Sequence, residues 1–506
     1  MAELEMQEYE QLNRNKETTY DVIKVDKGTI EMNHLVIQSW SQFFKNVLLI
    51  LIVSLFSAGV VSIVTYFTIC AQLEQKLADI DRKLAKIEKK NMTKLQETDN
   101  KENTYLDNNT MCYNGKSWQR LNDSKSCVCA AGFLGKQCEY SDGKDTSFMV
   151  VFHEGVRSPM PTILVASEST ARLSVLYFNN NTNQSITIDK NNTEYILSTS
   201  VLPSDGIHMV GVEIHSDVKI NVYGFLNGDR GSEGYLSMPM KFASTKYIIP
   251  TLTAFTAGYG FKNLLALLPI YQNTAVRTLI TASKPVFVVS GNQCNYAVQL
   301  QISKGGCQPF IELILPTDQL DNIFITPHIS TRLNNTVRIQ TANSTKLNVK
   351  FGNRNISKTL KAREYWDFYY NTTSFIFASN DILVMSYPHG LEGGKGDPFM
   401  MTIPGVNQYL YEYDFAVPTG FDSFISITVK RNSIDGVLLD GEFPNITSVL
   451  NISEGRIHYS TFSVPISDGA HHIEHRGKVR FGLWVYGNRF YDVYGYPAGL
   501  AYKIYH

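Results

Sequence analysis

The sequence has few charged residues and no excess of one sign. Charged residues make up 18% of its 506 positions, with 46 Lys and Arg against 47 Asp and Glu. Proteins that bind nucleic acid normally carry a clear basic excess, so no nucleic-acid partner is expected. Residues 1–46 also hold no apolar run of the roughly 7–15 residues that a cleaved signal peptide requires. The chain is too long for one hydrophobic core, which predicts several modules.

The motifs of common catalytic sites are missing as well. The chain has no G-x-S-x-G nucleophile elbow, no H-E-x-x-H zinc motif and no phosphate-binding P-loop. Its one histidine cluster, His471, His472 and His475, has two interpretations: metal ligands, or structural residues at the start of a strand. Neighbouring residues of a strand face opposite sides, which favours the structural interpretation. We therefore predict no enzyme activity, no metal and no cofactor.

A long uncharged segment lies near the N-terminus. No Asp, Glu, Lys or Arg occurs from Asn46 to Leu73, and residues 47–70 are almost wholly apolar. This run is longer than the ~20 residues that cross a bilayer core. We predict a transmembrane helix at 47–70, preceded by a cytoplasmic tail at 1–46. A buried core helix is the alternative.

Two signals disagree on the orientation of this helix. More basic residues lie just after the helix than just before it, which by the positive-inside rule would place the C-terminal part in the cytosol. Asn-x-Ser/Thr sequons and six cysteines, all after the helix, indicate an extracellular C-terminal part. We therefore predict a single-pass plasma-membrane protein with a cytoplasmic N-terminus and an extracellular C-terminus. The predicted glycosylation sites are Asn91, Asn108, Asn122, Asn180, Asn183, Asn191, Asn334, Asn343, Asn355, Asn371, Asn445 and Asn451.

A heptad-like pattern follows the apolar run. Leu73, Leu77, Ile80, Leu84 and Ile87 are spaced 4, 3, 4 and 3 positions apart, which places them on one face of a helix at 71–95. This stalk is either a short coiled coil that joins copies of the chain into a homo-oligomer, or a single solvated helix. Residues 96–111 are polar and are predicted to form a linker.

Four closely spaced cysteines occur at 112–140. The segment CVCAAGFLGKQC (127–138) resembles the second half of an epidermal-growth-factor-like module. The resemblance implies the disulfides Cys129–Cys138 and Cys112–Cys127, because such a module is too small to fold without bridges. The segment departs from that family by having four cysteines in place of six. A zinc site is the alternative use of these cysteines, but no histidine lies nearby at a suitable spacing.

The region 145–502 is predicted to be mainly β. Two patterns occur twice, 263 positions apart: S-D-G-x-H from 204 and from 467, and V-Y-G from 222 and from 485. Similar strand-like segments at 283–292 and 379–390 raise the number of related units to as many as four, so we predict tandem β-sandwich-like modules. Seven segments alternate or run apolar between Gly, Asn, Asp and Pro, at 147–152, 172–178, 219–225, 285–291, 381–387, 424–429 and 480–487.

Longer motifs in this region are more specific. They are GKDTSFMVVF (143–152), SKPVFVVSGNQC (283–294), GDPFMMTIPGVNQYLYEYDF (396–415), LDGEFP (439–444) and RFGLWVYGNRFYDVYGYPAGLAY (480–502). In this order they resemble the IgG Fc-binding protein N-terminal domain family, over residues 145–502. The resemblance implies an extracellular, β-rich recognition domain of mucus and cell-surface proteins, and a pairing of Cys294 with Cys307. We expect its ligand to be an extracellular protein or glycan.

The tail contains two Tyr-x-x-aliphatic motifs, Tyr9 with Leu12 and Tyr20 with Ile23. Their spacing resembles the immunoreceptor tyrosine-based activation motif, which implies that a cytosolic tyrosine kinase binds the doubly phosphorylated tail. Each motif alone also fits a sorting signal for an endocytic adaptor, and chance occurrence is a third interpretation. We predict a type II cell-surface recognition receptor that signals or is internalised. The alternative is an adhesion or mucus-organising structural glycoprotein without signalling.

Overall fold

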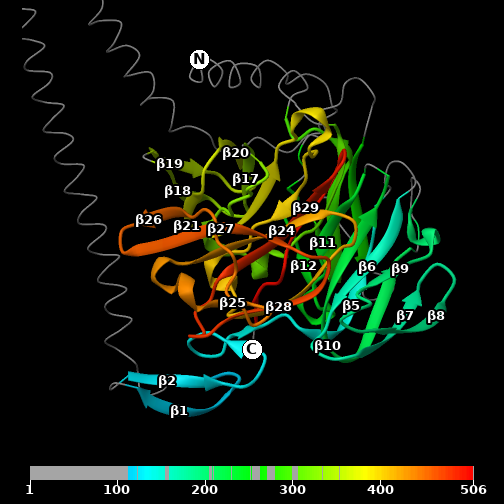
Figure 1. Ribbon diagram of the computed structural model, residues 1–506, viewed down its shortest axis with the longest axis horizontal. Coiled ribbons are helices and arrows are strands. Elements are labelled where there is room, and N and C mark those ends of the chain that lie inside the picture. Colours follow the sequence, from blue (N-terminus) through cyan, green and yellow to red (C-terminus); the bar gives the residue numbers. More distant parts are fainter. Residues whose placement is uncertain are drawn as a thin grey trace, which may run out of the picture. The chain divides into compact units, whose positions relative to one another are not determined.

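The computed structural model describes most of the chain from Cys112 onward as a β structure (Figure 1). Its described residues form strands β1–β31 and six short 3-10 helices, η1–η6. The statements below concern these residues alone. They are 112–121, 124–153, 159–203, 208, 210–229, 231–250, 252, 262–269, 280–298, 306–332, 334–352 and 354–504.

The fold class predicted from the sequence needs a correction. Within the described ranges no helix is long and apolar enough to cross a membrane. The transmembrane helix predicted at 47–70 and the helical stalk predicted at 71–95 lie outside these ranges. The predicted fold class with these helices, and the single-pass plasma-membrane location that depends on them, are therefore not supported. The fold that replaces them is mainly β, because the apolar segments pair as extended strands and satisfy their backbone groups in sheets.

Module 1 (145–236) shows the repeating unit of this fold. Its long strand β10 is paired twice along its length: its first half lies between β5 and β7, and its second half lies between β6 and β11. The outer strands β8 and β9 pair with β7 and β6. The strands are β5 (Asp145–Val150), β6 (Met160–Ala166), β7 (Ala171–Tyr177), β8 (Thr182–Ile188), β9 (Glu194–Ile196), β10 (Val212–Asn227) and β11 (Glu233–Leu236).

Module 3 (321–402) repeats this arrangement in the same chain order. Its long strand β21 lies first between β16 and β18 and then between β17 and β22, and β19 and β20 form the outer edges. The strands are β16 (Asp321–Ile325), β17 (Asn335–Thr341), β18 (Thr345–Phe351), β19 (Arg354–Leu360), β20 (Tyr365–Tyr370), β21 (Ser374–Pro388) and β22 (Met401–Thr402).

Module 4 (412–497) divides the long strand into two. Strand β28 lies between β23 and β25, and β29 lies between β24 and β30. The V-Y-G copies of the sequence repeat lie on β10 and β29, at equivalent places in modules 1 and 4. The strands are β23 (Glu412–Val417), β24 (Asp422–Lys430), β25 (Val437–Leu439), β26 (Leu450–Glu454), β27 (Ile457–Ile466), β28 (Gly469–His475), β29 (Gly482–Arg489) and β30 (Asp492–Pro497).

Module 2 (244–313) is described in part. Its long strand β14 pairs with β12, β13 and β15. The disulfide Cys294–Cys307 joins the end of β14 to the residue before β15. The strands are β12 (Ser244–Lys246), β13 (Asn263–Pro269), β14 (Thr281–Asn295) and β15 (Gln308–Leu313).

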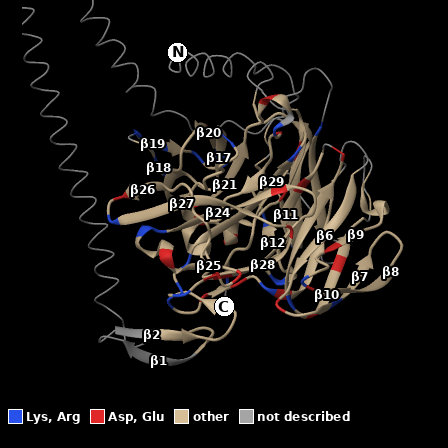
Figure 2. Ribbon diagram, in the orientation of Figure 1, with Lys and Arg blue, Asp and Glu red and all other residues tan. Residues whose placement is uncertain are grey.

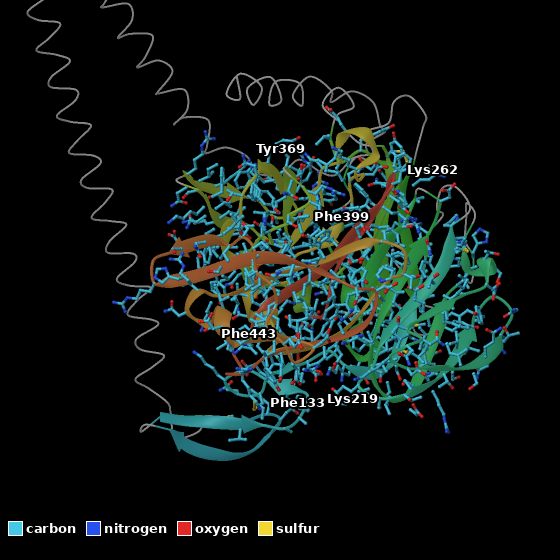
Figure 3. The ribbon with its side chains drawn as sticks, viewed as in Figure 1. Phe133, Lys219, Lys262, Tyr369, Phe399 and Phe443 are labelled. Carbon is cyan, nitrogen blue, oxygen red and sulfur yellow. A yellow bond between two sulfur atoms is a disulfide. The ribbon has the colours of Figure 1, made fainter. Side chains whose placement is uncertain are left out.

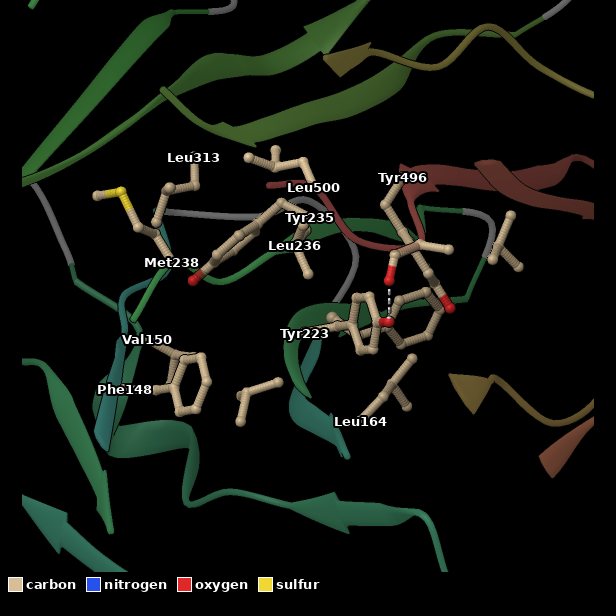
Figure 4. Packing of buried hydrophobic residues seen from close by; sticks show 14 of the residues in the cluster. Phe148, Val150, Leu164, Tyr223, Tyr235, Leu236, Met238, Leu313, Tyr496 and Leu500 are labelled. Carbon is tan, nitrogen blue, oxygen red and sulfur yellow. Dashed lines mark hydrogen bonds between the residues drawn. The ribbon is translucent and has the colours of Figure 1, made fainter. Parts of the chain in front are cut away.

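The last strand of each module lies at the centre of the domain. Strand β11 contacts β15 on one side and β30 on the other, and β22 contacts β30. The backbone N–H of Thr402 in β22 donates to the carboxylate of Glu312 in β15 at 2.7 Å, which closes the ring of modules. Large side chains fill the space around these strands (Figure 4). There Tyr223 and Tyr496 pack with ring centroids 4.8 Å apart, and the Tyr223 hydroxyl donates to the carbonyl of Ala498.

The cysteine module precedes the four modules. Its disulfides Cys112–Cys127 and Cys129–Cys138 are present, with Cα–Cα distances of 5.7 and 5.3 Å. Its hairpin is formed by β1 (Gly115–Leu121) and β2 (Ser124–Cys129). The small sheet that follows contains β3 (Phe133–Leu134), β4 (Tyr140–Ser141) and the last strand of the chain, β31 (Tyr502–Lys503). This pairing attaches the cysteine module to the end of module 4.

Candidate functional site

A small pocket with charged walls lies between modules 1 and 4. Its cavity volume is about 140 Å³. We call it the ion-pair pocket. Figure 2 shows acidic and basic residues close together in this part of the domain, near β10 and β28. The lining residues come from the end of β6 and the residues after β6 and β8 in module 1, and from β23, β28 and the turn after β25 in module 4: Ala166, Ser167, Glu168, Lys190, Asp414, Asp440, Ala470, His471 and His472.

Lys144 binds two residues that line the ion-pair pocket. It lies just before β5, its side chain is 10% exposed, and its ammonium group pairs with Asp414 and, at 2.7 Å, with Glu168. Burial alone would lower the pKa of Lys144, but the charge and hydrogen bond of Asp414 raise it above its ordinary value. The lysine is therefore charged, and it ties β23 of module 4 to module 1.

Asp414 also binds a histidine. Its second carboxylate oxygen lies 2.7 Å from Nδ1 of His472. Burial acts to raise the pKa of Asp414, but the hydrogen bond from His472 and the charge of Lys144 outweigh it and lower that pKa. The hydrogen bond to Asp414 in turn raises the pKa of His472, because the carboxylate stabilises the imidazolium. The pocket therefore holds a Lys–Asp–His chain whose two ends carry positive charge at acidic pH.

A tight turn positions a second carboxylate–histidine pair, Asp440 with His471. Leu439 and Glu442 exchange backbone hydrogen bonds across Asp440 and Gly441, which both have positive φ (51° and 87°), as a type I′ turn requires. The Asp440 carboxylate is thereby directed at Nδ1 of His471, at 2.7 Å, and accepts the backbone N–H of His472. The D-G pair of the LDGEFP motif is thus the residue pair that this turn needs.

His471 lies between Ser467 and Asp440 and contacts both. The Ser467 hydroxyl lies 3.3 Å from Nε2 of His471, and the Ser467 carbonyl oxygen lies 3.0 Å from the same nitrogen. The Asp440 carboxylate and the Ser467 carbonyl oxygen both only accept, so which ring nitrogen of His471 carries the hydrogen depends on its tautomer. The arrangement fixes the turn that leads into β28.

The three histidines of the sequence cluster have separate partners. His471 pairs with Asp440 and His472 with Asp414, whereas Nε2 of His475 lies 2.8 Å from the carbonyl of Ser433. No group of metal-ligating side chains occurs among the described residues. The structure thus gives each imidazole a hydrogen-bonding role in or beside β28.

The other predicted site residues divide into two groups. Tyr9, Leu12, Tyr20 and Ile23, together with Asn91, Asn108 and Asn122, lie outside the described residues and stay predictions. The sequons that the structure describes all place the asparagine on the surface, as glycosylation requires, although their occupancy stays a prediction. The exposed asparagines are Asn180, Asn183, Asn191, Asn334, Asn343, Asn355, Asn371, Asn445 and Asn451.

The sequence did not predict the acidic and basic residues of the ion-pair pocket. Lys144 and Asp414 are 270 positions apart, so no local spacing links them. Glu168 and Asp440 likewise come from different modules. The one local signal was the motif LDGEFP, whose Asp-Gly pair indicates a type I′ turn.

Part of the four-module ring matches a known protein family. Residues 265–487 match the family model described as IgGFc binding protein. This segment is an IgGFc-binding domain. The family predicted from the sequence motifs over 145–502 is thereby confirmed for residues 265–487, and a search of curated proteins found no match. Module 1 lies before the matched residues and has the strand order of module 3.

The ion-pair pocket allows a first test of how modules 1 and 4 are held together. We expect Asp414→Asn to lower the free energy of unfolding by about 3 kcal/mol, because it leaves the buried Lys144 with one exposed partner. The matched control is Glu168→Gln: that carboxylate is 70% exposed, so its loss should cost less than about 1 kcal/mol. Denaturant unfolding at neutral pH measures both. Equal effects of the two substitutions would contradict the assignment of Asp414 as the main partner.

Proposed function

We propose that the four-module ring is an extracellular recognition domain that binds a protein ligand and carries out no catalysis. The observation that carries this proposal is the match of residues 265–487 to the IgGFc binding protein family. Two features support an extracellular environment: three disulfides, which persist in oxidising compartments, and exposed sequon asparagines in modules 1, 3 and 4. The sequence carries no G-x-S-x-G, H-E-x-x-H or P-loop motif, which supports binding without catalysis.

The first ligand to test is the Fc region of immunoglobulin G, which the family description names. The full chain, produced in animal cells, is passed over immobilised Fc fragment and, as the matched surface, over Fab fragment. We expect saturable binding to Fc and none to Fab. Equal responses on the two surfaces, or no response on either, would contradict recognition of Fc.

A further inference from the structure

Two exposed aromatic rings precede sequons by the same distance. Tyr369 is 37% exposed and stands two positions before Asn371, and Phe443 is 51% exposed and stands two positions before Asn445. Large rings are normally buried, and an exposed ring loses the free energy that burial of its apolar surface would provide. Figure 3 labels both rings, which lie on modules 3 and 4. The shared spacing suggests one cause for both exposures.

Tyr369 and Asn371 are both exposed at the end of β20. Phe368 and Tyr370 on either side of Tyr369 are buried, and the Tyr369 ring lies edge-on to that of His389, with centroids 5.7 Å apart. Asn371 directly follows the last residue of β20, in a bend of the chain. Two residues of extended chain span at most roughly 7 Å. That separation is about the width of one sugar ring, so a sugar on Asn371 can cover the tyrosine ring.

The half-exposed ring of Phe443 is contacted by an arginine. The guanidinium of Arg476 lies 5.3 Å from the centroid of the Phe443 ring. Pro444 follows the phenylalanine, and the residue before a proline is held in an extended conformation. Phe443 and Asn445 therefore lie on an exposed stretch of chain, extended at Phe443, with the rigid Pro444 between them.

Thr373, the threonine of the Asn371 sequon, indicates whether a glycan is attached before or after module 3 folds. Thr373 is 3% exposed, and its hydroxyl donates to the backbone carbonyl of Thr326. The folded module therefore hides a hydroxyl that the sequon needs for recognition. Attachment must precede folding of module 3, so a glycan on Asn371 is present while β20 packs.

We propose that N-glycans on Asn371 and Asn445 stack their first sugar on the rings of Tyr369 and Phe443. The inference rests on the proposed extracellular function, since N-glycans are added only to exported chains. The oligosaccharide comes from a lipid diphosphate donor: the bond from Asn Nδ2 to sugar C1 forms, the bond from sugar to phosphate breaks, and the amide proton leaves. The apolar C–H face of the sugar then removes the aromatic ring from water.

A double-mutant cycle on the intact chain tests the stacking. The chain is produced in animal cells, site occupancy is measured by mass spectrometry of glycopeptides, and thermal unfolding is followed. We expect Asn371→Gln to lower the melting temperature by roughly 2 °C when Tyr369 is present, and to have no effect in a Tyr369→Thr background. Threonine is chosen because it favours a strand. The same cycle applies to Asn445 and Phe443→Thr.

Asn343 supplies the control sequon. It is exposed in the same module, and a buried threonine, Thr341, stands two positions before it. Loss of its glycan should act equally with and without Tyr369. An occupied Asn371 whose glycan stabilises equally in both backgrounds would overturn the stacking. An empty Asn371 would also overturn it. If other described sequons are occupied, the extracellular proposal survives that result; if every one is empty, the extracellular proposal fails too.

Discussion

Replacement of Glu233 by alanine is expected to lower the free energy of unfolding by roughly 3–5 kcal/mol. The Glu233 side chain is fully buried in β11 and accepts backbone N–H groups from three places: Met400, Gly495 and its own neighbour Gly234, at 3.1, 3.3 and 3.2 Å. One carboxylate therefore joins modules 1, 3 and 4 at the centre of the ring. Alanine would leave three buried donors without an acceptor, each of which costs about 1–3 kcal/mol.

Denaturant unfolding measures this effect, and two variants serve as references. Glu233→Gln keeps one acceptor oxygen but turns an amide N–H₂ toward backbone donors, so it should fall between alanine and the native residue. Glu454→Ala removes a half-exposed carboxylate paired with Lys350, and should change stability by less than about 1 kcal/mol. A loss at Glu233→Ala no larger than that of Glu454→Ala would contradict a central role for this carboxylate.

The stability of the ring is expected to fall as the pH rises from 5 to 8.5. Burial raises the pKa of Glu312 to about 8, although backbone N–H groups of Thr402 and Leu313 oppose the shift. In the unfolded chain the same carboxyl titrates near ~4.3. The folded state thus holds the proton more tightly, so its contribution is full below the unfolded pKa and is lost as the pH rises through the folded pKa. The total loss is roughly 3–5 kcal/mol.

Melting temperatures across this pH range test the assignment. Glu312→Gln carries no titrating proton, so its profile should be flatter than that of the native chain. His472 acts in the same direction because its pKa is also raised. It titrates in both proteins, however, so the difference between their profiles reports Glu312 together with its coupling to the buried Glu233. Parallel profiles for the native chain and Glu312→Gln would show that another group produces the dependence.

The long strands could be predicted from the sequence because their signal is local. Segments such as 219–225 and 480–487 alternate or run apolar between turn residues, and they lie on or overlap β10 and β29. The shortest strands carry no such signal: β22 has two residues and is defined only by its pairing with β21. The helices predicted from hydropathy and heptad spacing at 47–95 have no counterpart in the described fold.

The candidate site was less predictable than the fold. Its pairs join residues brought together by closure of the ring, as Lys144 and Asp414 are, and no spacing in the chain encodes such a contact. The disulfides could be inferred because cysteines carry a family pattern of their own. The histidines could be singled out as a cluster, but their separate carboxylate and carbonyl partners depend on three different turns and strands.

Closure of the ring also sets a constraint on biosynthesis. The Glu233 carboxylate accepts the N–H of Gly495, which is 262 positions later in the chain. At about 5–20 residues per second, the ribosome needs roughly 13–50 seconds to deliver that partner. During this interval β11 of module 1 lacks its neighbour β30 of module 4. Exposed strand edges and apolar surface are prone to aggregate. We therefore expect truncation within module 4 to leave the Glu233 carboxylate without its Gly495 partner and to destabilise module 1.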